Sequence, residues 1–344
     1  MKIDEFIKSF YIKKYKELAL LLTTVLVTSL IIVTSFEIFL GAKDRKYHEF
    51  MNLKYKEREM CETSSSDSTL IYEFKPNRCG MNSNGYFDED HNFSKSNGTF
   101  RIVIIGDSVA QGSGLESYRE SFGKILEDSL NKQLRSWRFE TVILARGGYS
   151  TVQELTILKK EAFKYNPDLI IWSYVLNDPA HPLYHNANNE AGRYFFKPKS
   201  YFTNYVSMKL FFIKEKLNSR ECNLDPDYFL HCVYWPNIKS NIGEIGKISK
   251  EKNTKIIFLI HPTFLKSGFN NYSLKIYHQK LVSVATADGL IAYDLLEEFS
   301  KYKSSEIKQN PTNWYDPWHP NKKGHEIIGK YLARRLANEI LNNP

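Results

Sequence analysis

One serine stands where a buried strand should end, and its position suits nucleophilic chemistry. Ser108 lies two positions after an apolar run at residues 100–106, in the sequence FRIVIIGDS. A serine hydroxyl is a weak nucleophile at neutral pH, so it needs a neighbouring base to accept its proton. His319 can be that base, and Asp316, three residues earlier in DPWHPN, can hold the far nitrogen of its ring. These residue types together predict acyl transfer through a covalent acyl-enzyme.

Two further positions can donate hydrogen bonds to the oxyanion that forms during acyl transfer. Gly148 lies in RGGYST, just past an apolar run at residues 140–145, and Asn177 lies in VLNDP, just past another run at 168–175. A glycine lets substrate approach the backbone N–H, and an asparagine side chain carries amide N–H groups. With the backbone N–H of Ser108, they form a candidate oxyanion hole.

Each of these motifs also occurs in ordinary turns. Gly-Asp-Ser and Asn-Asp are frequent turn sequences, and DPWHPN can simply cap a helix. Other histidines are equally compatible with surface or core positions: His181, His185, His261 and His325. The catalytic interpretation is favoured by order along the chain, because each motif follows an apolar run or precedes the last amphipathic segment.

The elements that must position these residues are visible as five short apolar runs rich in β-branched residues. They lie at residues 100–106, 140–145, 168–175, 254–260 and 289–295. Continuous hydrophobicity is typical of strands buried on both faces. Segments with helical periodicity separate the runs, and in residues 117–134 Phe122, Leu126 and Leu130 fall on one side. The alternation predicts an α/β domain whose ligand site lies at the carboxyl ends of parallel strands.

The N-terminal region contains a long uncharged stretch. Residues 18–36 read LALLLTTVLVTSLIIVTSF, close to the roughly 20 residues that a helix needs to cross the hydrocarbon core. The stretch lacks the polar stripe of a buried core helix, and no clear small-x-small cleavage site follows it. We therefore expect a cytoplasmic segment at residues 1–17 and a retained transmembrane helix at residues 18–40, embedded in the lipid bilayer.

The cysteines bear on the side of the membrane that the domain occupies. All four follow the apolar stretch, as two local pairs: Cys61 with Cys79, and Cys222 with Cys232. Such pairs suit disulfides in an oxidising compartment, and neither has CxxC spacing. Basic residues flank the stretch on both sides, so the positive-inside rule does not decide the orientation. Unpaired thiols on a cytosolic face are the alternative. We favour a single-pass protein with its domain outside the cytoplasm, in the periplasm or at the cell surface.

Two regions fall outside the strand and helix alternation. Residues 41–98 are polar and irregular, which predicts a loop-rich juxtamembrane segment, with residues 88–91 as a solvated turn rather than a metal site. Residues 180–236 interrupt the domain expected over 99–344 and are rich in aromatic residues. Because this insertion follows a strand end, we expect a lid or a binding wall; an insertion that packs on itself is the alternative.

The overall composition is that of a basic globular protein. Hydrophobic residues make up 42% and charged residues 25% of the 344 residues, and the formal charge is +8. The lysines are spread along the chain, without zinc-finger spacing, an RNP motif or a basic helix. We therefore expect the charge to serve solubility and the membrane surface, and we expect no nucleic-acid partner.

The motifs together resemble one known family. GDS followed by QGSG, then GGYST, LND, and DPWHP followed by GH look like the blocks of the SGNH (GDSL-type) hydrolases, over roughly residues 100–341. The resemblance implies a flavodoxin-like three-layer α/β/α sandwich that acts without a metal or cofactor on carboxylic esters, or that transfers acetyl groups to or from glycans. It assigns Ser108 as the nucleophile, Gly148 and Asn177 to the oxyanion hole, and Asp316 and His319 as the remaining catalytic pair. Val175 departs from the family pattern, which usually has glycine two residues before the asparagine.

From the residues and the resemblance we expect a membrane-anchored serine esterase that removes O-acyl groups from an envelope glycan or lipid. An O-acetyltransferase acting on an extracytoplasmic polysaccharide is one alternative, because a sugar hydroxyl can replace water as the acceptor. A non-catalytic envelope binding or assembly protein on the same fold is another.

Overall fold

The computed structural model describes residues 2–179, 226–265, 267–309 and 316–342, together with positions 200, 202, 203, 206, 210, 213 and 217. The chain divides into two compact units. The first comprises Met1–Lys56 and Arg193–Asn218, and the second comprises Glu57–Gly192 and Ser219–Pro344. The second unit contains the α/β domain.

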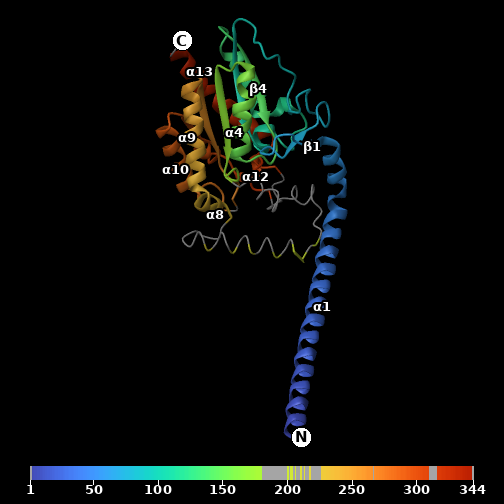
Figure 1. Cartoon of the computed structure of the whole chain (residues 1–344). Coiled ribbons are helices and arrows are strands. Elements are labelled where there is room, and N and C mark those ends of the chain that lie inside the picture. Colours follow the sequence, from blue (N-terminus) through green and yellow to red (C-terminus); the bar gives the residue numbers. More distant parts are fainter. Residues whose placement is uncertain are drawn as a thin grey trace. The chain divides into compact units, whose positions relative to one another are not determined.

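The first unit contains most of a long N-terminal helix, α1 (Lys2–Cys61), which Figure 1 shows as one unbroken element. Within the described part of the chain, only its stretch Phe10–Ala42 is long and apolar enough to cross a membrane, and most of that stretch is exposed. The expected span at 18–40 falls inside it. A helix of this kind is typical of a membrane anchor and also of a signal sequence.

The expectation of loops from residue 41 is wrong for the first part of the juxtamembrane segment, because α1 continues through Cys61. The sequence from Ala42 to Met60 contains neither glycine nor proline and is rich in Lys, Glu and Arg. These charged residues have high helix propensity, and the polarity that suggested loops is equally compatible with an exposed helix.

An N-terminal arm, residues 61–98, connects α1 to the sheet. It carries a short antiparallel pair, β1 (Glu62–Ser64) and β2 (Tyr72–Phe74), and a disulfide joins Cys61 to Cys79. Side chains fasten the arm to the domain: the Tyr86 hydroxyl donates to Glu161 at 2.7 Å, and Gln153 Nε2 donates to the Leu70 carbonyl at 2.7 Å. The arm is therefore an integral part of the α/β domain.

The domain is built on one sheet of five parallel strands, in the order β4-β3-β5-β6-β7. Its strands are β3 (Thr99–Gly106), β4 (Arg138–Ala145), β5 (Leu169–Val175), β6 (Lys255–His261) and β7 (Ile291–Asp294). These five strands match the five predicted runs, and their order is that of the flavodoxin-like fold. The predicted fold class is confirmed.

Helices cover the sheet in two groups. The longer ones are α3 (Phe122–Gln133), α4 (Thr151–Lys160), α9 (Trp235–Glu251), α10 (Lys275–Ala287) and α13 (Lys322–Asn342). α3 packs against α13, whereas α4 packs against α9, which also contacts α10. Because parallel strands are connected by right-handed crossovers, the reversal of strand order after β4 puts these groups on opposite faces. Figure 1 shows α4 and α9 beside the sheet.

Shorter helical turns occupy the connections: α2 (Ser108–Gln111), η1 (Tyr118–Glu120), η2 (Ala162–Tyr165), α8 (Pro226–Val233), α11 (Leu296–Phe299) and α12 (Ser304–Ile307). Most of the aromatic insertion at 180–236 lies outside the described residues, so its role as a lid stays a prediction. Cys232 in α8 is disulfide-bonded, whereas Cys222 lies outside the described residues.

The order in which the chain adds strands to the sheet reverses between β3 and β5, and this reversal positions the site. Gly106 at the end of β3 is aligned with Ala145 on β4 and with Ser173 on β5. The residues that follow these three positions therefore emerge together at the carboxyl edge. In doubly wound sheets, ligands bind outside the strands at this reversal.

Candidate active site

The structure brings Ser108, His319 and Asp316 into one hydrogen-bonded chain. His319 Nε2 lies 2.8 Å from Ser108 Oγ, and His319 Nδ1 lies 2.6 Å from Asp316 Oδ1. Ser108 and His319 are separated by 211 positions in the sequence. Both side chains of the His319–Asp316 pair are partly buried, with 23% and 18% exposed. The imidazole therefore contacts the hydroxyl on one side and the carboxylate on the other.

The electrostatics fix which ring nitrogen carries the proton. Burial opposes ionisation of Asp316, but its hydrogen bonds and charge interaction with His319 outweigh burial and lower the pKa of the carboxyl. An ionised carboxylate only accepts hydrogen bonds, so Nδ1 of His319 carries a proton. In the neutral ring the lone pair then lies on Nε2, facing Ser108. Burial lowers the pKa of His319, but Asp316 raises it more, and the net pKa is above its usual value.

The loop that carries Asp316 and His319 is held on both sides. The backbone N–H groups of Trp318 and His319 donate to the Asp316 carboxylate, and the Phe264 N–H donates to the Pro317 carbonyl at 2.6 Å. The carboxylate is thus fixed by its own turn. This turn explains how an Asp-Pro-Trp-His sequence can orient an imidazole.

Gln309 ties this loop to the loop that follows the nucleophile. Its backbone N–H donates to the His319 carbonyl at 2.9 Å, and its side-chain Nε2 donates to the Ser113 carbonyl at 2.9 Å. One residue therefore contacts both the base loop and the nucleophile loop.

Ser108 is the first residue of α2, and the preceding aspartate shapes this turn. Asp107 caps α2, because its Oδ1 accepts a hydrogen bond from the Val109 N–H at 2.9 Å, and its Oδ2 lies 3.2 Å from Ser108 Oγ. Asp107 is fully buried, which raises its pKa. The strand therefore ends in Asp-Ser because the carboxylate caps the short helix that presents the hydroxyl.

The glycine pair after β4 has an unusual backbone that a side chain would not fit. Gly148 has φ +81°, and a Cβ there would lie 2.8 Å from the Tyr72 hydroxyl. The Gly147 N–H donates to Gln111 Oε1 at 2.5 Å, and the Gly147 carbonyl accepts a hydrogen bond from the Tyr72 hydroxyl. Asn177 lies in the turn after β5, at the same edge of the sheet. Ser108, Gly148 and Asn177 thus follow the three strands that meet at the reversal, whereas Asp316 and His319 lie just before α13.

Two buried acids near this edge were not anticipated as part of the site. Glu154 in α4 and Asp178 after β5 are fully buried, and burial raises the pKa of each well above its usual value, aided by the Asp107 charge. Glu154 accepts a hydrogen bond from Trp172 Nε1 at 2.9 Å, and Asp178 accepts one from the Val175 N–H at 2.6 Å. Asp178 therefore supports the turn that carries Asn177.

The other histidines have structural surroundings where they are described. His261 and His325 are buried, and burial lowers the pKa of each to about 3, so both are neutral. His261 contacts the Ser173 hydroxyl at 2.8 Å, and His325 Nδ1 accepts the Phe122 N–H at 3.2 Å. His181 and His185 lie outside the described residues.

The acidic cluster at residues 88–91 is not the solvated turn that the sequence suggested. Asp88 is buried and His91 bridges Asp88 and Glu140 at 3.0 and 2.9 Å. Potential ligand atoms of Asp88, Glu89 and His91 lie within 4.8 Å of one another. The ammonium of Lys124 already contacts Asp88 and Glu89, each at 3.0 Å. A side-chain cation therefore balances these carboxylates, and the cluster links the arm to strand β4.

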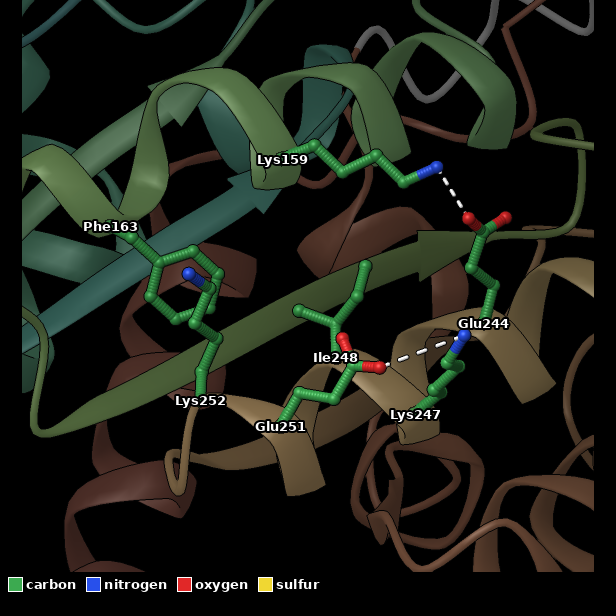
Figure 2. Close-up of a pocket in the computed structure, with 7 residues that line it drawn as sticks. All are labelled: Lys159, Phe163, Glu244, Lys247, Ile248, Glu251 and Lys252. Carbon is green, nitrogen blue, oxygen red and sulfur yellow. Dashed lines mark ion pairs between the residues drawn. The ribbon is translucent and has the colours of Figure 1, made fainter.

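A small surface pocket of about 240 Å³ lies between α4, η2 and α9, away from the sheet edge. Figure 2 shows its lining, where Lys159 pairs with Glu244 at 2.5 Å and Lys247 with Glu251 at 3.6 Å. Each glutamate of the lining is thus paired with a lysine, and the third lysine, Lys252, lies 5.4 Å from the centre of the Phe163 ring. These contacts indicate helix packing rather than ligand binding.

Sequence reasoning did not find Tyr72, Gln111, Glu154 or Gln309 as parts of the site. Gln111 had a signal, since it lies on the turn after Ser108. Tyr72 had none, because it lies in an irregular segment 75 positions before the carbonyl that it contacts.

Comparison with known proteins gives one family match. Residues 104–327 match the GDSL-like Lipase/Acylhydrolase family, and no curated protein sequence matches the chain. The match begins inside β3 and ends inside α13, so it covers the sheet and leaves out α1 and the N-terminal arm.

Solved structures with a similar chain trace are distant in sequence. The lipase/acylhydrolase from Enterococcus faecalis is 17% identical, over 70% of this chain and 96% of its own, with a TM-score of 0.43. The psychrotrophic esterase EstA from Pseudoalteromonas sp. is 16% identical, over 71% and 99%, with a TM-score of 0.41. A two-domain esterase (CEX) active on acetylated mannans is 15% identical, over 70% and 49%, with a TM-score of 0.44.

The contact between His319 and Asp316 predicts a measurable pKa difference. The pKa of His319 should lie above 6.5, because the neighbouring carboxylate stabilises the imidazolium. Asp316→Asn should lower this pKa, because the variant removes the charge that stabilises the imidazolium. NMR titration of the histidine ring protons in the full-length protein measures both values. The buried His325 serves as the internal control, and an unchanged His319 pKa in the variant would contradict the assigned contact.

The buried Glu154 predicts a pH-dependent stability. Its folded pKa is raised above the usual 4.5, so its contribution to stability is full below that pH and is lost as the pH rises toward the folded pKa. Glu154→Gln removes the ionisable group while keeping an acceptor for Trp172. Thermal melting from pH 5 to 8 should therefore show a smaller loss of stability in the variant than in the parent. Glu251→Gln, at an exposed position, is the control; parallel curves for Glu154→Gln and the parent would refute a raised pKa.

Proposed function

The chain belongs to the GDSL-like Lipase/Acylhydrolase family, a family of ester-hydrolysing enzymes, and from this premise we propose that it is a membrane-anchored serine esterase. One observation carries the proposal: a single imidazole joins the Ser108 hydroxyl at 2.8 Å to the Asp316 carboxylate at 2.6 Å. This is the arrangement that a serine needs to act as a nucleophile at neutral pH.

The proposed reaction begins when Ser108 Oγ attacks the ester carbonyl carbon and its proton passes to Nε2 of His319. Asp316 stabilises the imidazolium and keeps the ring oriented. The negative oxygen of the tetrahedral intermediate lies among the backbone N–H groups of Ser108 and Gly148 and the amide of Asn177. When the intermediate collapses, the bond to the alcohol breaks and His319 donates its proton to the departing oxygen.

The second half of the proposed reaction releases the acid. Water attacks the acyl-enzyme while His319 accepts a proton from it, and the bond between the acyl carbon and Ser108 Oγ then breaks. The proton returns from His319 to Ser108. The products are a carboxylic acid and an alcohol, and the enzyme regains its starting state.

We propose that the α/β domain lies outside the cytoplasm and that α1 anchors it to the membrane. The Cys61–Cys79 disulfide and the disulfide-bonded Cys232 support an oxidising compartment. The apolar stretch Phe10–Ala42 supports retention in the bilayer. A tethered esterase meets substrates of its own surface at a high effective concentration. We therefore propose acylated glycans or lipids of the envelope as substrates.

Ser108→Ala tests the nucleophile. It should lower the turnover of p-nitrophenyl acetate by about a thousandfold or more, because the acyl-enzyme can no longer form, and it should abolish labelling by a fluorophosphonate probe. Ser117→Ala, in the cap of η1 on the same connection, is the matched control and should keep both. Turnover of the Ser108→Ala variant at the parent rate would exclude the mechanism.

Release from the anchor tests the location of the substrate. The full chain, with a protease site introduced into α1 after the apolar stretch, is reconstituted in vesicles that display an O-acetylated glycan or an acylated lipid. Cleavage should lower turnover of the displayed ester by about tenfold or more, because it removes the effective concentration. The soluble p-nitrophenyl acetate should be hydrolysed equally before and after cleavage. Equal rates on the displayed ester would argue against a surface substrate, and an acetylated acceptor product would indicate acetyl transfer.

A further inference from the structure

Two side chains from different parts of the chain hold the backbone of Gly147, one at its N–H and one at its carbonyl. The Gly147 N–H donates to Gln111 Oε1, and the Gly147 carbonyl accepts from the Tyr72 hydroxyl. Gln111 belongs to α2, the same short helix that begins with Ser108. Tyr72 belongs to β2 in the N-terminal arm, outside the residues that match the family.

The carbonyl of Gly147 and the N–H of Gly148 belong to the same trans peptide plane. In a trans peptide these two groups point in opposite directions, so a side chain that fixes the carbonyl also fixes the direction of the N–H. A hydrogen bond to the carbonyl also polarises the peptide and strengthens its N–H as a donor. The Tyr72 hydroxyl therefore acts on the group that the proposed mechanism uses to hold the oxyanion.

The Tyr72 side chain is itself held in place. It is 3% exposed, and its ring packs edge-on against Tyr149 with the ring centres 5.4 Å apart. The Tyr149 hydroxyl donates to the Tyr72 carbonyl at 2.7 Å, and the Cys61–Cys79 disulfide closes the arm around β1 and β2. A buried phenol that is fixed at both its backbone and its ring gives its hydroxyl little freedom to move.

The backbone N–H of an unrestrained glycine is poorly suited to act as a preorganised hydrogen-bond donor. Gly148 has φ +81°. Glycine can adopt many other backbone conformations of similar energy, so it does not hold this one by itself. Donors that must reorient during the reaction lose much of their electrostatic advantage. The contact from Tyr72 provides the restraint that the glycine lacks.

We propose that Tyr72 is a positioning residue for the oxyanion hole, supplied by the N-terminal arm, which orients and polarises the Gly148 N–H through the Gly147 carbonyl. This inference rests on the proposed esterase function and adds to it. It makes the arm part of the catalytic apparatus, although the arm lies outside the family core and carries none of its motifs.

Tyr72→Phe is the direct test, because it removes the hydroxyl and keeps the buried ring. Tyr86→Phe is the matched control: it removes another buried hydroxyl that fastens the same arm, here to Glu161. Full-length protein is assayed with p-nitrophenyl acetate for kcat and KM, and selective ¹⁵N-glycine labelling follows the Gly148 amide by NMR. Thermal melting of both variants reports any shared loss of stability.

Tyr72→Phe should lower kcat by about tenfold to a hundredfold, somewhat less than the loss of an oxyanion donor, with KM changed less than about threefold. The Gly148 amide resonance should shift in this variant and stay in place in Tyr86→Phe, which should keep its kcat. An unchanged kcat or an unshifted Gly148 resonance in Tyr72→Phe would overturn the proposal. Equal losses of kcat in both variants would show that Tyr72 only stabilises the arm, which also overturns it.

The same measurements separate this inference from the proposed function. If the parent protein fails to react with a fluorophosphonate at Ser108 while the Gly148 resonance still shifts in Tyr72→Phe, the esterase mechanism fails and the structural contact stands. If the parent is labelled and the resonance does not shift, the esterase mechanism stands and the role of Tyr72 fails.

Discussion

The hydrogen bond between Asp316 and Nδ1 of His319 is the interaction on which the rest of the site depends. An ionised carboxylate at 2.6 Å determines which ring nitrogen keeps its proton and therefore which one can receive another. Without it, the contact between His319 and Ser108 would not determine which of the two groups accepts the proton. Two backbone N–H groups of the turn that carries both residues donate to the same carboxylate. One local structure therefore positions both the acid and the base.

The second requirement is that the site residues lie close together, and the sheet provides this. Residues far apart in sequence meet because parallel strands end at one edge, and the reversal between β3 and β5 opens that edge to a ligand. The nucleophile follows β3, the glycine pair follows β4, and Asn177 follows β5. Fully buried strands below these positions, such as Ile102–Ile105, provide a rigid support. A mobile support would lose the geometry that nucleophilic catalysis requires.

The sequence predicted the parts of this molecule that obey short-range rules. The five strands appeared as continuous apolar runs. Ser108, Gly148 and Asn177 were found because their motifs follow strand ends, and Asp316 and His319 because their motif precedes the last amphipathic helix. The helical character of residues 41–61 was missed, since charged residues serve exposed helices and loops alike. Tyr72 and Asp88 were missed for another reason: their burial depends on an arm that folds back over the sheet, and no local pattern encodes such long-range packing.

Gln309 holds the base loop and the nucleophile loop at the same time, by its backbone on one side and its side chain on the other. The length of this one side chain therefore sets the distance between the two loops. A longer or shorter side chain at this one position would therefore change the separation of nucleophile and base while leaving both of those residues in place.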